Sequence, residues 1–289
     1  MPFTEHRYST GDGLSLYYRD YGSPPGGAGR PAVLCLPGLS RNSKDFHAPA
    51  ERLAGDWRVI CPDFRGRGRS DYDPDPANYR MEVYLDDLRH LLAALDLGRV
   101  VVIGTSMGGI AAMAMAAAMP TALAGVVLND VGAVVPMGPL APIVAGIRSD
   151  HSFATWDDAI KALRTVWPNA PAQTEEDWLD LARATFTERP DGRIGRDWDG
   201  AIADQVARLP PGDTDLWQYF RALRNIPPGV VRGALSPILT ADILRAMVAD
   251  RPDLIHAEVP GVGHPPNLRE QPATDVIDAI LARAFLPRH

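Results

Sequence analysis

The sequence predicts an α/β protein whose mostly parallel sheet is flanked by helices. Two observations lead to this class: short, continuous apolar runs recur along the chain, and stretches with a helical spacing of apolar residues alternate with them. Strands that are apolar on both faces are typical of parallel sheets, because helices cover both sides. With 289 residues, of which 46% are hydrophobic and 22% charged, the chain can form one large domain that carries an insertion.

The predicted elements follow one another in a regular order. A Gly-Asp-Gly turn comes before a weakly alternating stretch, which suggests an early antiparallel hairpin. The expected buried strands cover residues 32–36, 58–61, 100–103, 125–128 and 254–259, and the expected helices cover residues 43–53, 80–95, 107–119 and 272–285. Strands that alternate with helices in this way form βαβ units.

The segment from about residue 134 to residue 220 breaks this rhythm. Five tryptophans lie there among amphipathic stretches, without a clear buried strand: Trp156, Trp167, Trp178, Trp198 and Trp217. We therefore predict that residues 1–133 and 221–289 form the core, and that residues 134–220 form a helical lid inserted after the sixth strand. The tryptophans could line a partly apolar substrate site or form the core of the lid itself.

A serine stands at the turn between a buried strand and a helix. The turn reads Gly104-Thr105-Ser106-Met107-Gly108, and a strand that reverses directly into a helix strains its central residue. The two glycines remove side chains that would clash, so Ser106 is the predicted nucleophile. We expect the N–H groups of Met107 and of Leu39, in the loop after an earlier strand, to form an oxyanion hole.

One of the seven histidines follows a late strand inside a rigid turn. The stretch Pro260-Gly261-Val262-Gly263-His264-Pro265-Pro266 has glycines on one side of the histidine and prolines on the other. A loop of this kind can hold an imidazole within reach of the serine. His264 is therefore the predicted general base.

These features together resemble the α/β-hydrolase superfamily, especially its lidded esterases and carbon–carbon bond hydrolases. Four motifs occur in the order of the family: Leu36-Pro37-Gly38, the stretch from Asp63 to Ser70, the turn from Gly104 to Gly108, and Val262-Gly263-His264. The resemblance covers nearly the whole chain. It implies an α/β-hydrolase fold and a Ser-His-acid triad that works through an acyl-enzyme.

The acid of this triad is missing from its usual place. In the family it follows a segment like Arg232 to Ser236, but here the next residue is Pro237, and Pro228-Gly229 adds doubt about the strand that precedes this segment. Asp130, after the strand expected beside the serine strand, is the preferred replacement, since some members resemble this arrangement. Asp242 is the second candidate, although a first helical turn also suits it structurally. The third alternative is that no residue replaces the acid.

A dense run of arginines lies within the second family motif. Arg65, Arg67 and Arg69 alternate with glycines, and we expect them to form a structural ion-pair node rather than a phosphate site. Asp63, which ends a strand just before them, comes before Ser106 in the chain. We expect it to take part in ion pairs.

Composition excludes several classes of function. The formal net charge is −7 and the 29 basic residues are scattered, which argues against nucleic acid or an anionic membrane as a partner. No spacing typical of a metal site or a dinucleotide fingerprint occurs, so we expect no metal and no cofactor. The absence of a signal-peptide pattern favours a cytoplasmic protein. Whether the chain forms a homodimer is left open.

The sequence thus predicts a serine hydrolase that acts on a small to medium, partly apolar carboxylic ester. Three alternatives stay open at this point. The first is a carbon–carbon bond hydrolase of a diketone, which uses the same apparatus. The second, implied by the resemblance, is a cofactor-free oxygenase that uses a His-Asp pair as base. The third is a ligand-binding member whose catalysis is impaired because of Pro237.

Overall fold

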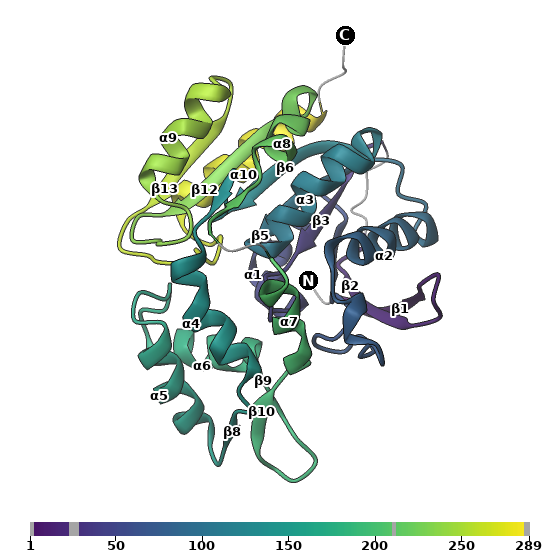
Figure 1. Ribbon diagram of the computed structural model, residues 1–289. Helices are drawn as coiled ribbons and strands as arrows, with labels where there is room; N and C mark the ends of the chain where they lie inside the picture. The colour runs from purple at the N-terminus through teal and green to yellow at the C-terminus, as the bar shows by residue number, and fades with distance from the viewer. Residues whose placement is uncertain (1–2, 23–28, 210–211, 286–289) are drawn as a thin grey trace.

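A computed structural model describes residues 3–22, 29–209 and 212–285. Its centre is an eight-stranded sheet in the order β1-β2-β4-β3-β5-β6-β12-β13 (Figure 1). The strands are β1 (Thr4–Ser9), β2 (Ser15–Asp20), β3 (Ala32–Leu36), β4 (Val59–Pro62), β5 (Val100–Thr105), β6 (Leu123–Asn129), β12 (Pro228–Gly233) and β13 (Ile255–Val259). The β1–β2 hairpin is antiparallel and pairs antiparallel with β4, whereas the other six strands are parallel. The predicted mostly parallel sheet is therefore confirmed.

Helices cover both faces of this sheet. Helices α1 (His47–Leu53) and α10 (Gln271–Phe285) pack on one face, and α2 (Met81–Ala94), α3 (Met107–Ala118) and α9 (Ala241–Asp250) pack on the other. Alternate residues of β3 serve the two layers: Val33 and Cys35 face α1 and α10, while Leu34 and Leu36 face the opposite layer. Burial on both faces explains why each strand is a continuous apolar run in the sequence.

Strand β12 forms despite its unfavourable first two residues. Pro228 is the first residue of the strand, a position at which proline is tolerated, and it pairs with Val126 of β6. Gly229 lies under α10, where an added Cβ would come within 2.8 Å of Ile280 Cγ1 and Val276 Cγ1. The glycine thus allows the helix to approach the sheet closely. The doubt that Pro228-Gly229 raised about this strand is therefore wrong.

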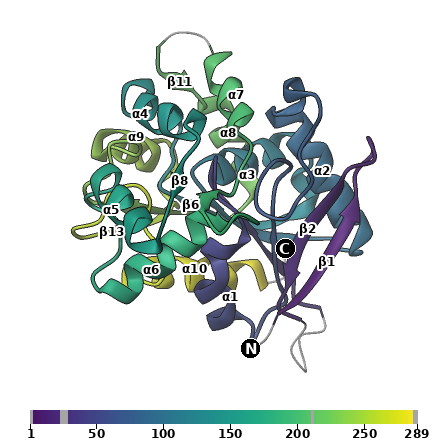
Figure 2. The same cartoon turned by 90° about the horizontal axis from the view of Figure 1, so that it is seen from below.

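The segment 134–220 leaves the sheet after β6 and returns to it at β12. It contains α4 (Met137–Arg148), α5 (Trp156–Val166), α6 (Glu175–Thr185), α7 (Asp204–Ala207) and the start of α8 (Trp217–Arg221). Figure 1 shows α4, α5 and α6 gathered below the sheet, on the side of the carboxyl end of β5, and Figure 2 shows the same helices from below. We name residues 134–220 the cap segment.

The cap segment also contains strands, which the sequence analysis did not anticipate. Strands β8 (Ser152–Phe153), β10 (Ile194–Arg196) and β9 (Phe186–Glu188) form a three-stranded sheet, and β7 (Val134–Val135) pairs with β11 (Thr214–Asp215). Strands of two or three residues are too short to show an alternating pattern. Short 3₁₀ helices complete the described chain: η1 (Ser43–Phe46), η2 (Pro76–Asn78), η3 (Pro120–Ala122), η4 (Gly200–Ala203) and η5 (Ala222–Asn225).

Candidate active site

Ser106 lies between β5 and α3 in a conformation that few non-glycine residues adopt. Its φ is 52° and its ψ is −116°, and its N–H donates to the carbonyl of Asn129 at 2.9 Å. The flanking glycines make this turn sterically feasible. An added Cβ on Gly104 would lie 2.3 Å from the carbonyl oxygen of Gly108, and one on Gly108 would lie 2.1 Å from that of Leu36.

The imidazole of His264 lies between Ser106 and Asp130. His264 Nε2 is 3.1 Å from Ser106 Oγ, and His264 Nδ1 is 2.7 Å from Asp130 Oδ2. The side chain of Asp130 is completely buried and that of His264 is 9% exposed. If Nδ1 carries a proton that it donates to the carboxylate, Nε2 is free to accept the proton of the serine.

Asp130 reaches this place from the end of β6. Its backbone has a φ of 57°, and its N–H donates to the carbonyl of Val231 at 2.8 Å. Its second carboxylate oxygen, Oδ1, accepts the N–H of Gly233 at 2.9 Å. Both carboxylate oxygens therefore have a partner, which fixes the plane of the group that faces His264.

The second candidate for the acid does not lie at this site. Asp242 is in the first turn of α9, where it forms an ion pair with Arg245, and its side chain is 82% exposed. Asp63, for which we expected ion pairs, is buried instead and accepts the backbone N–H groups of Ser43 at 2.6 Å and Arg69 at 2.9 Å. Burial raises the pKa of the Asp63 carboxyl group, although these hydrogen bonds act in the opposite direction.

The two residues expected to supply oxyanion donors lie on either side of the serine. Met107 is the first residue of α3, so its N–H has no acceptor within the helix. On the other side, an added Cβ on Gly38 would lie 3.8 Å from Ser106 Cβ, which places the loop of residues 38–39 directly beside the serine. Both residues therefore belong to segments that adjoin the serine.

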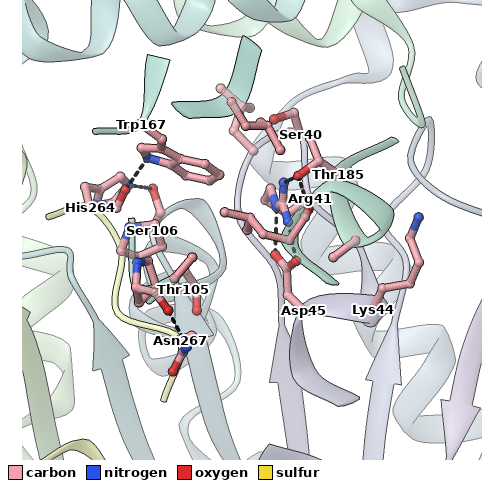
Figure 3. Close-up of a pocket in the computed structure, with 18 of the residues that line it drawn as sticks. Ser40, Arg41, Lys44, Asp45, Thr105, Ser106, Trp167, Thr185, His264 and Asn267 are labelled. Carbon is pink, nitrogen blue, oxygen red and sulfur yellow. Dashed lines mark hydrogen bonds and ion pairs between the residues drawn. The ribbon is translucent and has the colours of Figure 1, made fainter. Parts of the chain in front are cut away.

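Ser106 and His264 open into a cavity of about 530 Å³ between the core and the cap segment (Figure 3). Most of the wall is apolar. Helices α4, α5 and α6 contribute to it with side chains such as Ile143, Leu163 and Leu181, and Phe186 of β9 lines it as well. The cations of Arg41 and Lys44 belong to the same wall, but Arg41 pairs with Asp45 and Lys44 pairs with Asp197. The cavity is therefore largely apolar, and its wall also holds charged side chains, some of them in ion pairs.

The tryptophans of the cap segment divide between its core and the cavity. Trp178 is buried without lining the cavity. Trp198 is also buried, with its indole N–H donating to the carbonyl of Ile147 at 3.0 Å, and it lines part of the cavity as well. Trp167 stands over the site, where its N–H donates to the carbonyl of His264 at 2.6 Å. Its ring also faces the guanidinium of Arg41, whose carbon lies 5.5 Å from the ring centroid. No sequence signal distinguishes Trp167 from the other four.

Asn129 is a further residue that the sequence analysis missed. Its side-chain NH₂ group donates to Thr105 Oγ1 at 3.0 Å and to the carbonyl of Pro266 at 2.9 Å. It thereby joins the ends of β5 and β6 to the loop that carries His264. The roles of Trp167 and Asn129 depend on contacts between distant segments, which a motif does not reveal.

The described residues form neither a metal site nor a membrane-spanning helix. Among residues 3–22, 29–209 and 212–285, no group of three or more His, Cys, Asp or Glu side chains is placed to hold a metal ion. Within the same ranges, no helix combines the length and the apolar character that crossing a membrane requires.

Comparison with known proteins gives consistent results over almost the whole chain. The family model described as "Alpha/beta hydrolase family" matches residues 33–279. A 3-hydroxybutyrate-oligomer hydrolase of Cupriavidus necator is 33% identical over 260 residues, which are 87% of each chain. A 2-(acetamidomethylene)succinate hydrolase of Mesorhizobium japonicum is 28% identical over 272 residues, which are 92% of each chain.

Solved structures show the same relationship. An alpha/beta hydrolase from Novosphingobium aromaticivorans superimposes with a TM-score of 0.90 at 40% identity, over 97% of this chain and 98% of the other. The structure of an E-2-(acetamidomethylene)succinate hydrolase superimposes with a TM-score of 0.81 at 26% identity, over 97% and 98% of the two chains. Both of these curated relatives are named as hydrolases and match most of this chain. The chain belongs to the alpha/beta hydrolase family.

Proposed function

We propose that this hydrolase cleaves carboxylic esters through an acyl-enzyme, with Ser106, His264 and Asp130 as its catalytic triad. The observation that carries the proposal is the continuous path of polar contacts from Ser106 Oγ through both imidazole nitrogens to the buried carboxylate of Asp130. An acid after β6 supplies the carboxylate that Pro237 cannot. The alternative of an impaired, ligand-binding member was based on Pro237, and a carboxylate from Asp130 removes this reason for it.

The chemistry follows from the positions of these groups. Ser106 Oγ forms a bond to the acyl carbon of the ester while His264 Nε2 takes the hydroxyl proton. The tetrahedral intermediate collapses when the bond to the alkoxide oxygen breaks, and His264 returns the proton to this leaving group. Water then attacks the acyl-serine by the same route, giving the free carboxylic acid and the original serine. Asp130 keeps Nδ1 protonated and stabilises the imidazolium that forms in each half-reaction.

The negative charge of the intermediate falls on the former carbonyl oxygen. We infer that the N–H groups of Leu39 and Met107 bind this oxygen, because their residues flank Ser106 on two sides. Donors that are in place before the reaction stabilise the transition state without reorganisation.

The substrate we infer is a small to medium ester with apolar parts. A cavity of about 530 Å³ with a mostly apolar wall supports this class. The name of the Cupriavidus necator relative, a 3-hydroxybutyrate-oligomer hydrolase, supports short-chain acyl groups as well. We also infer that the cap segment acts as a lid, since α4, α5 and α6 line the cavity on the side away from the sheet.

Labelling with a fluorophosphonate, followed by peptide mass spectrometry, tests the nucleophile. The reagent should modify Ser106, and Ser106→Ala should abolish both labelling and the hydrolysis of p-nitrophenyl acetate and butyrate. Ser40→Ala is the matched control, because Ser40 is another serine in the wall of the same cavity. In the Ser40→Ala variant, the fluorophosphonate should still modify Ser106.

Labelling on Ser40, or ester hydrolysis that persists in Ser106→Ala, would contradict the proposal. Measurement of oxygen uptake with the same enzyme tests the oxygenase alternative, in which the serine only binds the substrate.

An assay with a diketone, run beside the ester assays, tests the carbon–carbon bond hydrolase alternative.

A further inference from the structure

Arg67 contacts both residues of the proposed oxyanion hole. Its side chain is completely buried, with an exposed fraction of 0%. Its Nε donates to the carbonyl of Leu39 at 2.9 Å, and its Nη2 lies 3.7 Å from Met107 Sδ. One guanidinium group thus reaches the loop on one side of Ser106 and the helix start on the other.

The charge of Arg67 has only neutral partners in the part of the chain that the structure describes. Besides Leu39 and Met107, its Nη1 donates to the carbonyl of Arg65 at 2.7 Å and to the hydroxyl of Tyr84 at 2.9 Å. The ring of Tyr84 also faces its guanidinium carbon at 5.0 Å. A cation that is buried without a carboxylate costs free energy, so its retention calls for a physical reason.

The neighbouring Arg65 shows the contrast within the same motif. Its guanidinium forms ion pairs with Asp12, Asp73 and Asp87, at 2.8, 2.5 and 2.6 Å. The structural ion-pair node expected for the arginine run is therefore centred on Arg65. Arg67 does not share these carboxylates.

The backbone around Arg67 is held from both sides. Gly66 and Gly68 have φ values of 75° and 55°, and an added Cβ on Gly66 would come within 2.7 Å of the ring of Tyr79. The cap segment pairs with this turn, since Gly68 N–H donates to the carbonyl of Asp197 and Asp199 N–H donates to that of Gly66, both at 2.8 Å. The position of Arg67 is therefore set by the fold before any substrate binds.

We propose that Arg67 is a positioning residue of the oxyanion site, which holds Leu39 and Met107 in place and adds an uncompensated positive charge behind their N–H groups. The inference rests on the proposed function. A fixed positive charge in a water-excluded site stabilises the anionic tetrahedral intermediate more than the neutral ester. The charge should therefore lower the free energy of the transition state more than that of the bound substrate. Arg67 does not itself contact the reacting atoms, and the proposed triad of Ser106, His264 and Asp130 is unchanged.

The test compares Arg67→Met, which keeps the length of the side chain but removes its charge and donors, with Arg67→Lys, which keeps the charge but loses the planar fork. For p-nitrophenyl butyrate we expect Arg67→Met to lower kcat about 10- to 100-fold, somewhat less than the loss of a direct oxyanion donor, with KM changed less than about threefold. Arg67→Lys should recover part of this loss. The affinity for a trifluoromethyl ketone, which forms a charged tetrahedral adduct with the serine, should fall in parallel with kcat/KM.

The matched control is Arg58→Met, which breaks an ion pair with Asp20 at the opposite end of β4. It should leave kcat and the ketone affinity within about twofold of the wild type, whatever it does to the unfolding midpoint. An unchanged ketone affinity in Arg67→Met would overturn the inference while the proposed function stands. If Arg67→Met does not fold, Arg67→Lys decides by the same two readouts. A wild-type enzyme that hydrolyses no ester would contradict both proposals.

Discussion

The carboxylate that meets His264 comes from the end of β6, although the family resemblance places it after β12. The two strands are parallel neighbours, so their carboxyl ends lie side by side. The contacts show how close they are: the N–H of Asp130 reaches the carbonyl of Val231, and the N–H of Gly233 reaches the Asp130 carboxylate. An acid at either strand end can therefore serve the same histidine.

Replacement of this carboxylate gives the first prediction. Asp130→Asn should lower kcat/KM for ester hydrolysis by about 10³- to 10⁴-fold, because an amide cannot stabilise the imidazolium and can favour the wrong imidazole tautomer. Steady-state kinetics on p-nitrophenyl butyrate measures the loss, and the rate of fluorophosphonate labelling of Ser106 should fall with it.

Asp242→Asn is the matched control for this prediction. Asp242 is exposed and paired with Arg245 on α9, so its substitution should change kcat/KM less than twofold. A large loss in Asp242→Asn together with a small one in Asp130→Asn would reverse the assignment of the acid.

Single residues differ in how far the sequence reveals them. Ser106 and His264 stand in turns whose glycines and prolines are visible as motifs, whereas the choice between Asp130 and Asp242 depends on which strands are neighbours. Asp63 was expected in ion pairs, but its buried carboxylate caps backbone N–H groups of two loops. Arg67 could not be distinguished from Arg65, because the difference lies in partners far along the chain.

Among the elements, the turn from β5 into α3 leaves no room for added side-chain atoms at its glycines. Gly108→Ala should destabilise the fold by at least about 3 kcal/mol, since the new Cβ would lie 2.1 Å from the carbonyl oxygen of Leu36 and only backbone movement could relieve the clash. Denaturant unfolding followed by circular dichroism measures the change.

Gly138→Ala is the matched control in α4, where an added Cβ meets nothing within 4 Å. It should leave the free energy of unfolding unchanged or raise it by roughly 0.5 kcal/mol. Equal effects of the two substitutions would contradict the steric account of the turn.

The loop between α5 and α6 is hydrogen-bonded to the loop that carries His264. Three hydrogen bonds join them: Trp167 Nε1–H to the His264 carbonyl at 2.6 Å, Gly263 N–H to the Asn169 carbonyl at 2.8 Å, and Asn267 Nδ2–H to the Pro171 carbonyl at 3.1 Å. This part of the cap segment therefore forms a continuous wall with the catalytic centre. Any movement of residues 167–171 away from the core must break these hydrogen bonds to the loop that carries His264.

Trp167→Phe tests this coupling, because it keeps an aromatic ring but removes the N–H donor. We expect kcat to fall about tenfold, as a net loss of one hydrogen bond predicts, while KM for p-nitrophenyl acetate changes little. Trp198→Phe calibrates the result, since it removes a similar bond to a carbonyl within the cap segment. An equal fall of kcat in the two variants would show that His264 is not the group that Trp167 holds.

The elements themselves were largely predictable, for a physical reason. Strands buried on both faces and helices with one apolar side leave strong patterns, and their boundaries fall within a few residues of the structure. Strands β8, β9 and β10 leave no such pattern. They are held by pairing with one another and by a cluster of Phe153, Phe186 and Trp198, which only the folded cap segment brings together.

At the scale of the whole molecule, the arrangement of sheet and helix layers can be predicted from the sequence. The junctions, by which we mean side-chain contacts that join segments distant in the sequence, cannot. Arg65 forms one of these junctions, since its three carboxylates come from the turn between β1 and β2, from the loop after β4 and from α2. It ties the antiparallel hairpin to the parallel part of the sheet. Asp73 and Asp87 are buried, whereas the side chain of Asp12 is 44% exposed.

Because of this junction, the free energy of unfolding should depend on pH within a defined acidic range. Hydrogen bonds from Arg65, and less strongly from Thr10, lower the pKa of Asp12 from 3.8 to about 2 against a partial desolvation. A carboxyl group whose pKa is lower in the folded state stabilises the fold above its unfolded pKa, and this contribution is lost as the pH falls through the folded value. The stabilisation should therefore be complete above about pH 4.5 and should shrink progressively as the pH falls toward 2.

Asp12→Asn should show this range directly. The difference in free energy of unfolding between the wild type and the variant, taken from urea titrations at a series of pH values, should be constant from pH 7 to about pH 4.5 and then shrink as the pH falls toward 2. The Asn side chain keeps its size and cannot titrate, so the loss of charge is the only pH-dependent change. A difference that stays constant down to pH 2.5 would show that the Arg65–Asp12 contact does not hold the hairpin to the sheet through its charge.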